Sequence, residues 1–180
     1  MKTELHVRIA ISGKSGCGNS TVSRLVAEEL GLRLVNYTFH TIAEERNIDF
    51  TVLCRMAEDD PSWDRYLDRR QVELAREGPC VLGSRLAVWL LEDADLKVYL
   101  TAPLEIRAAR IHRREGGRYE DVLAYTRERD ERDRGRYLKL YGIDNNDYEF
   151  VDLVIDTEPY TPEEVAARIV SAVNERQLSS

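Results

Sequence analysis

The sequence predicts an α/β fold of three layers, in which helices cover both faces of a parallel five-stranded sheet. Five short apolar runs alternate with segments of helical periodicity along nearly the whole chain. The first run is largely apolar, as a strand covered on both faces is. It leads into a glycine-rich turn and then into a helical segment. A ligand is therefore expected at the carboxyl ends of the strands.

The individual elements follow from the apolar pattern and from the residues that end each segment. We expect strands at residues 6–12, 32–36, 80–82, 96–100 and 151–155. We expect helices at 20–30 before Gly31, at 86–90, after Thr101-Ala102-Pro103, at 119–141 after Gly116-Gly117, and after Thr161-Pro162-Glu163-Glu164. Residues 37–77 are helical, charged and too long for a simple crossover, so they predict an inserted helical region. Residues 1–180 are expected to form one domain.

The composition argues against several classes of function. Of the 180 residues, 26 are Lys or Arg and 33 are Asp or Glu, so the net charge is −7. This balance argues against general binding of nucleic acid polymers or anionic membranes. Cys17, Cys54 and Cys80 have no C-x-x-C spacing, so neither disulfides nor zinc are expected. Without a signal peptide or an apolar run of about 20 residues, the chain is expected to be cytoplasmic. We also expect it to be a monomer.

The glycine-rich turn indicates a phosphate-binding loop. Glycines allow positive φ angles and bring backbone N–H groups against a polyphosphate, and the next helix turns its N-terminus to the same anion. Ser20 stands where a hydroxyl can bind Mg²⁺. The alternative, a turn that binds nothing, is disfavoured by the apolar runs on both sides. The candidate ATP-binding residues are Gly13, Lys14, Ser15, Gly16, Cys17, Gly18, Asn19, Ser20 and Thr21.

One position of this loop departs from the pattern G-x-x-x-x-G-K-[ST]. Asn19 stands where a lysine reaches the β- and γ-phosphates of a nucleotide. Lys14 directly follows the first glycine and is a candidate to replace that cation. Our hypothesis is that the substitution Lys14→Ala impairs phosphoryl transfer far more than Asn19→Ala does.

A second informative stretch, residues 127–137, is rich in arginine. On a helix, Arg129, Asp133 and Arg136 share one face at i, i+4 and i+7. Guanidinium groups suit phosphate and base-edge acceptors, and an aspartate accepts from ribose hydroxyls. The alternative is a solvated helix held by its own ion pairs. Because 126–136 has no apolar stripe, a bound anion or mobility is expected there, and a lid over residues 110–136 combines both.

These features resemble the nucleoside-monophosphate kinases of the P-loop superfamily, and most closely the compact, archaeal-type cytidylate kinases. The more specific matches are Arg136-Tyr137 and Tyr141-Gly142-Ile143-Asp144. Further matches are residues 13–21, Asp60-Pro61, 67–75, Arg85-Leu86-Ala87 with Trp89, 94–98, 102–105, 113–116 and Asp156-Thr157. Residues 128–136 are also similar to the E-R-D-x-R-D-x-x-R segment of the longer bacterial cytidylate kinases. The resemblance thus spans nearly the whole chain.

The resemblance implies a set of residues that bind CMP. Arg85 and Arg110 look like ligands of the acceptor phosphate. Arg129 and Asp133 would hold the ribose or the phosphate, and Arg136 would contact the cytosine edge.

The resemblance also implies a catalytic set and shows further departures. Arg113 and Arg114 look like lid residues, and residues 37–77 would be the monophosphate-binding region. Gly83 stands where we expect an acidic residue that organises Mg²⁺, and His40 where these kinases carry an arginine. The expected catalytic residues are therefore Lys14, which the loop itself suggests, together with Arg110, Arg113 and Arg129.

The function implied is an ATP-dependent, Mg²⁺-requiring kinase that moves the γ-phosphoryl group to CMP or dCMP. Two other functions stay open. One is a kinase of the same fold that acts on another nucleotide or on a small hydroxylated metabolite. The other is a nucleotide-binding regulator, because the changes at Asn19 and Gly83 could silence transfer.

Overall fold

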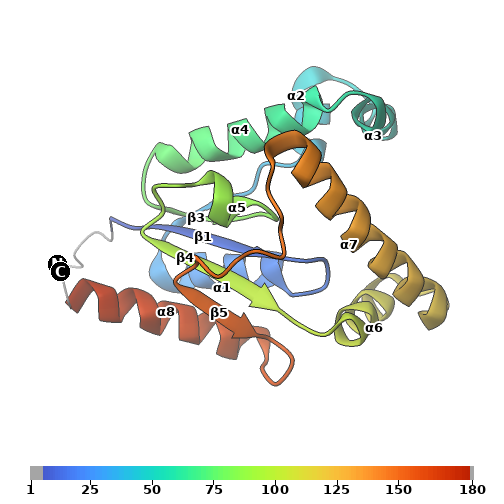
Figure 1. Cartoon of the computed structure of the whole chain (residues 1–180). Coiled ribbons are helices and arrows are strands. Elements are labelled where there is room, and N and C mark those ends of the chain that lie inside the picture. The colour runs from blue at the N-terminus through green and yellow to red at the C-terminus, as the bar shows by residue number, and fades with distance from the viewer. Residues whose placement is uncertain (1–5, 179–180) are drawn as a thin grey trace.

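The structure, a computed structural model, describes residues 6–178 and confirms the predicted three-layer α/β fold (Figure 1). Its five strands form one parallel sheet in the order β2-β3-β1-β4-β5. The central strand, β1, buries Ile9, Ala10 and Ile11 completely. The strands are β1 (Arg8–Gly13), β2 (Arg33–Val35), β3 (Cys80–Gly83), β4 (Leu96–Thr101) and β5 (Leu153–Asp156). Because the strands are parallel, their carboxyl ends meet at one edge of the sheet.

The fifth strand begins later than its apolar run predicts. β5 starts at Leu153 rather than at Val151, because the N–H of Val151 donates to the carbonyl of Tyr148 within a turn, at 3.2 Å. β5 also lies at the edge of the sheet, and its Val154 remains 47% exposed. An apolar run therefore locates this strand without showing where the preceding turn ends.

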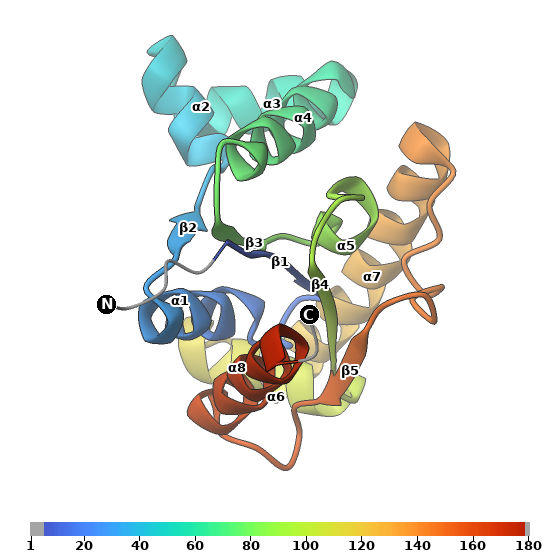
Figure 2. The same ribbon diagram turned by 90° about the vertical axis from the view of Figure 1, so that its left-hand side faces the viewer.

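Helices cover both faces of the sheet (Figure 2). The helix α1 (Asn19–Leu30) and the helix α8 (Pro162–Leu178) pack on one face, and α4 (Ser62–Arg76) with the one-turn α5 (Ala87–Leu90) packs on the other. Gly31 ends α1 as predicted: its φ is 64°, and its N–H donates to the carbonyls of Ala27 and Glu28. The predicted cap of α8 is present as well, since Thr161 and Glu164 exchange side-chain to backbone hydrogen bonds.

Three helices lie between β2 and β3, as the length of residues 37–77 predicts. They are α2 (Phe39–Arg46), α3 (Phe50–Asp59) and α4. Thr38 caps α2, and Asp49 caps α3. These helices share a small hydrophobic cluster formed by Tyr37, Ile42, Ala43 and Leu53. Residues of α4 belong both to this cluster and to one that covers the sheet, so α4 connects the inserted helices to the sheet.

Two further helices, α6 (Leu104–Glu115) and α7 (Tyr119–Tyr141), lie at the carboxyl ends of the strands (Figure 1). The predicted lack of an apolar stripe on α7 is confirmed over residues 126–136, where only Thr126 and Asp133 are buried. Something other than a hydrophobic core must therefore hold α7. No helix in the described part of the chain is long and apolar enough to cross a membrane.

Candidate active site

The loop between β1 and α1 is built to receive an anion. Its turn is closed by the N–H of Cys17, which donates to the carbonyl of Lys14 at 3.1 Å. Gly18 is the N-cap of α1, and no side chain caps the helix there. The first N–H groups of α1 are therefore left for a ligand, and the helix dipole favours a negative charge at the same point.

Gly16 shows why the loop needs glycine. Its φ is +82°, and a Cβ at this position would lie 2.7 Å from the carbonyl oxygen of Arg107. Any other residue would be strained in the backbone and would also collide with α6. The loop and α6 therefore pack directly against each other, backbone to backbone.

Asn19, at the position of the usual lysine, points its amide into the protein. Its Nδ2 donates to the carbonyls of Ile11 at 3.0 Å and Ser84 at 3.4 Å, and its Oδ1 accepts from the hydroxyl of Ser23 at 2.9 Å. Asn19 thus ties the carboxyl ends of β1 and β3 together.

Gly83, where an acidic residue was expected, lies against the same group. A Cβ on Gly83 would lie 2.8 Å from the Cβ of Ser23 and 2.9 Å from the Oδ1 of Asn19. Ser23 and Asn19 therefore occupy the space that a side chain at this position would need.

We expect the substitution Gly83→Ala to lower the free energy of unfolding by about 1–3 kcal/mol, since overpacking forces the neighbours to move. Denaturant unfolding measures this change. Gly78→Ala is the matched control, because nothing lies within 4 Å of a Cβ there. Equal stability of the two variants would contradict the prediction.

Lys14 is in contact with a segment that lies far along the chain. Its Nζ donates to the Oδ1 of Asn146 at 2.7 Å. Asn146 belongs to residues 142–148, the segment that follows α7, which we call the strap. The ammonium of Lys14 is thus held at the mouth of the loop by a neutral acceptor.

All the residues predicted to bind CMP except Arg110 gather beside the loop. Arg85 donates to the Oγ of Ser15 at 2.6 Å and forms an ion pair with the buried Asp133. Arg136 lies 3.4 Å from the other oxygen of Asp133 and 3.6 Å from Asp64 of α4. Residues from the loop, from the turn after β3, and from α4 and α7 therefore meet in one group, which we call the arginine cluster.

Arg129 also belongs to this cluster, but no carboxylate of the cluster forms an ion pair with it. The guanidinium is half-buried, and it makes no hydrogen bond or ion pair with any residue in 6–178. Burial and the neighbouring Arg85 lower the pKa of Arg129, and Asp133 offsets only part of this effect. The structure thus contains a cation that an anionic ligand can neutralise.

Arg107 is a structural residue that the sequence did not single out. It forms a two-fold ion pair with Asp130, with distances of 3.1 and 2.6 Å, and donates to the carbonyl of Ser15 at 3.1 Å. Only 5% of Arg107 is exposed. This buried pair fixes α7 to α6 and to the loop, in place of an apolar stripe. Its only signal in the sequence is the helical spacing that Arg107 shares with Arg110 and Arg114.

Other predicted residues lie outside the arginine cluster. Arg110 donates to the carbonyl of Gly16 at 3.2 Å and to both oxygens of Thr157 at 2.8 Å. Arg113 is exposed and has no ion pair with the described residues. His40 stacks on Phe50 with a centroid distance of 3.6 Å. Only Arg110 of these three contacts the loop.

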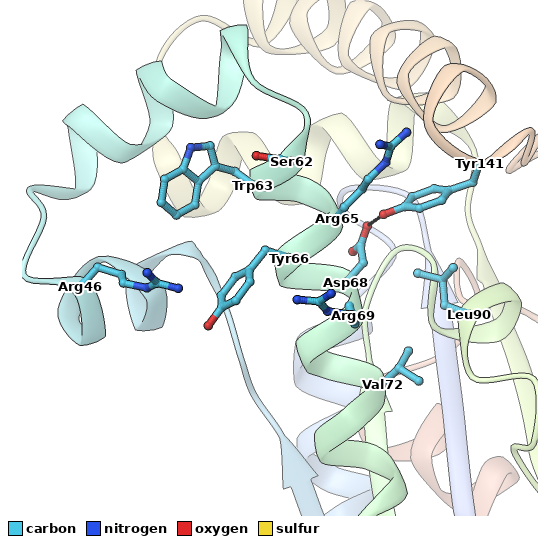
Figure 3. Close-up of a pocket in the computed structure, with 10 residues that line it drawn as sticks. All are labelled: Arg46, Ser62, Trp63, Arg65, Tyr66, Asp68, Arg69, Val72, Leu90 and Tyr141. Atoms are coloured by element: carbon cyan, nitrogen blue, oxygen red, sulfur yellow. Dashed lines mark hydrogen bonds between the residues drawn. The ribbon is translucent and has the colours of Figure 1, made fainter.

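A cavity lies on an adjacent face of α4 (Figure 3). Its volume is about 690 Å³. At its edge, the hydroxyl of Tyr141 donates to the Oδ2 of Asp68 at 2.6 Å, which connects the end of α7 to α4. The lining residues are Arg46, Ser62, Trp63, Arg65, Tyr66, Asp68, Arg69, Val72, Leu90 and Tyr141.

The carboxyl group of Asp68 should make the stability of the protein depend on pH. Burial raises its pKa to about 6, although the hydrogen bond from Tyr141 opposes the shift. Because the folded state then binds the proton more tightly than the unfolded state, Asp68 reduces stability as the pH rises from about 4 to about 6. We expect the free energy of unfolding of Asp68→Asn to increase, relative to that of the wild type, by on the order of 2 kcal/mol across this pH interval. Urea unfolding of both proteins at several pH values measures the difference, and a difference that does not change with pH would contradict it.

A parallel sheet with an anion-binding loop after its central strand, and cations facing that loop, defines a nucleotide-binding protein of the P-loop class. Within this class, the family model described as "Cytidylate kinase-like family" matches residues 8–159. The chain belongs to the cytidylate kinase-like family, as its sequence motifs predict.

The curated relatives agree with this family. A "Cytidylate kinase 2" of Borreliella afzelii is 49% identical over 178 residues, which cover 97% of this chain and 100% of that protein. A "Cytidylate kinase" of Pyrococcus horikoshii is 41% identical over 168 residues, which cover 92% and 88%.

Solved structures confirm the fold. A shikimate kinase from Acinetobacter baumannii, in complex with shikimate, has a TM-score of 0.64 at 18% identity and covers 97% of each chain. An uncharacterized protein from Eubacterium ventriosum has a TM-score of 0.68 at 17% identity, covering 93% of this chain and 98% of that one. At such identities the likeness concerns the fold alone.

Proposed function

We propose that this protein transfers the γ-phosphoryl group of ATP to CMP or dCMP and releases ADP with CDP or dCDP. The observation that carries the proposal is the double contact of Arg85, with Ser15 of the loop and with Asp133 of α7. It brings cations suited to an acceptor phosphate against the loop suited to the donor phosphates. Membership in the cytidylate kinase-like family supports cytidine nucleotides as acceptors.

On the donor side, the backbone of residues 13–21 binds the phosphates of ATP. Lys14 supplies the cation that Asn19 does not. Ser20 is exposed at the start of α1, where its hydroxyl would hold a Mg²⁺ ion bound together with ATP. No cluster of acidic, histidine or cysteine residues in the described ranges offers a second metal site. The metal, when bound with ATP, neutralises the charge of the phosphates.

On the acceptor side, Arg85 and Arg129 hold the phosphate of CMP, Asp133 the ribose, and Arg136 the cytosine edge. The contacts of Arg110 with Gly16 and Thr157 favour a role beside the donor nucleotide in place of the acceptor. Arg113 is exposed on α6 and reaches the reacting phosphate only if the lid closes.

Transfer then depends on position and charge. The nucleophile is a phosphate oxygen of CMP that is already ionised, so no side-chain base is needed. Arg85, Arg129 and Lys14 offset the negative charge as the two phosphates approach each other. Movement of residues 110–136 over the site excludes water, which otherwise accepts the phosphoryl group.

The test is a steady-state comparison of CMP, dCMP, UMP and AMP as acceptors with ATP and Mg²⁺. We expect CMP or dCMP to have the highest kcat/KM, and no turnover when EDTA removes the metal. A preference for UMP or AMP of about tenfold or more would overturn the choice of acceptor.

Asn19 and Gly83 favour a second candidate, a nucleotide-binding regulator without catalysis. The proteins of this class that transfer phosphate rely on a loop lysine and an acidic metal partner, and neither stands at its usual place here. Calorimetric binding of ATP and CMP without any formation of CDP would support the regulator and exclude the kinase.

We also propose that the protein is cytoplasmic and acts as a monomer, since its proposed site is formed within one chain. Sedimentation velocity with and without nucleotides tests the second part. A dimer that is required for activity would contradict it.

A further inference from the structure

The strap, residues 142–148, is fixed to two elements on either side of it. Arg134 of α7 forms a two-fold ion pair with Asp144, at 2.8 and 2.5 Å. On the other side, Tyr99 of β4 donates to the carbonyl of Asn145 at 3.1 Å and stacks on Tyr148 with a centroid distance of 4.0 Å. The strap is therefore held in one conformation by α7 and β4.

Within the strap, Asp144 orients Asn146. The Oδ1 of Asp144 accepts the N–H of Asn146 at 3.0 Å, and a turn closes as the N–H of Asp147 donates to the carbonyl of Asp144 at 3.0 Å. Arg134 is the main cause that lowers the pKa of Asp144 to about 2, with smaller effects of the Asn146 N–H and of Lys14. Asp144 is therefore charged at any physiological pH, and the turn that carries Asn146 persists.

The side chain of Asn146 then holds Lys14, 132 positions away in the sequence. The acceptor is a neutral amide, although the carboxylate of Asp144 is only two residues away. A neutral amide lacks the opposite charge by which a carboxylate would also attract the ammonium, so Lys14 leaves an amide more easily than it would leave a carboxylate. An ammonium has three N–H donors, and this bond uses one of them. Two donors remain for phosphate oxygens.

We propose that Asn146 is a positioning residue that sets Lys14 toward the donor phosphates, and that Asp144 and Arg134 hold Asn146 in place. This inference rests on the proposed function, because it assigns Lys14 the cationic role in phosphoryl transfer. It also assigns a role to the strap, none of whose residues binds a nucleotide in the proposed function.

A double-mutant cycle tests the proposal by steady-state kinetics with CMP and ATP. We expect Asn146→Ala to lower kcat about tenfold, because a cation misplaced by a short distance stabilises the transition state less. The KM for ATP should change little, because the loop backbone still binds the phosphates. In the Lys14→Ala background, Asn146→Ala should change kcat less than about twofold. Equal effects of Asn146→Ala in both backgrounds would overturn the proposal.

The substitution Asn146→Asp separates positioning from a structural role. It keeps the acceptor oxygen but makes it a carboxylate that holds the ammonium more tightly. We therefore expect the KM for ATP to rise while kcat falls less than in Asn146→Ala. A kcat as low as that of Asn146→Ala with an unchanged KM would count against the proposal.

Stability measurements and one control complete the experiment. The thermal midpoint of Asn146→Ala should stay within about 3 °C of the wild type, and a larger fall that accounts for the lost activity would overturn the proposal. Asp147→Ala changes an exposed side chain of the same strap and should leave kcat unchanged.

The proposal and the proposed function can fail separately. If the wild type does not phosphorylate CMP, the proposed function fails alone. The affinity for ATP is then measured by calorimetry for Asn146→Asp, which should weaken ATP binding more in the wild type than in the Lys14→Ala background, and equal effects in both backgrounds contradict the proposal.

Discussion

Replacement of Lys14 by alanine is expected to lower kcat about a hundredfold, because it removes a fixed charge from the transferring phosphate. Lys14 is the cation of the loop itself, and its Nζ is already placed at the mouth of the loop by Asn146. The loop backbone still binds ATP in the variant, so the KM for ATP should rise much less than kcat falls. Single-turnover measurements with CMP and excess enzyme separate the chemical step from product release.

Asn19→Ala provides the comparison for Lys14→Ala. Asn19 bonds to Ile11, Ser84 and Ser23 inside the protein, so its loss should reduce stability by about 1–2 kcal/mol and affect kcat less than Lys14→Ala does. If Asn19→Ala impairs transfer more than Lys14→Ala, the assignment of the cationic role to Lys14 is wrong.

The parts of this protein that could be predicted from its sequence are those set by local pattern. β1, the loop and α1 follow from an apolar run, spaced glycines and helical periodicity within residues 8–30, all close in the chain. The shared face of Arg129, Asp133 and Arg136 follows from helical spacing alone, and the structure brings these residues together with Arg85. Their roles toward CMP remain proposals.

The parts that could not be predicted depend on contacts between distant segments. The helical spacing on α6 does not show that Arg107 is buried against Asp130, because an arginine on a charged helix is ordinarily exposed. The inward orientation of Asn19 depends on Ser23 and on the absence of a side chain at Gly83. The contact between Lys14 and Asn146 joins a loop near the start of the chain to a strap near its end. Such contacts become visible only once the elements are packed.

Arg129→Met is expected to lower kcat/KM for CMP by about 10²- to 10³-fold, since arginines that contact a transferring phosphoryl group contribute effects at least this large. Methionine keeps much of the side-chain volume and removes only the charge and the donors. The same substitution should leave the thermal midpoint unchanged or raise it. Arg129 is a desolvated cation beside Arg85 without a hydrogen bond among the described residues, so the free protein gains nothing from its charge.

A loss of kcat/KM for CMP without a loss of thermal stability is expected only for an arginine that binds a ligand. A residue that only holds α7 in place would lose stability together with activity when it is replaced. Arg107→Met is the matched comparison, because it breaks a buried ion pair with Asp130 and should cost about 3–5 kcal/mol of stability. Steady-state kinetics with CMP and thermal unfolding of both variants measure the two quantities, and calorimetric titration gives their affinity for CMP. If Arg129→Met binds CMP as tightly as the wild type but unfolds at a lower temperature, Arg129 supports the helix and does not bind the acceptor.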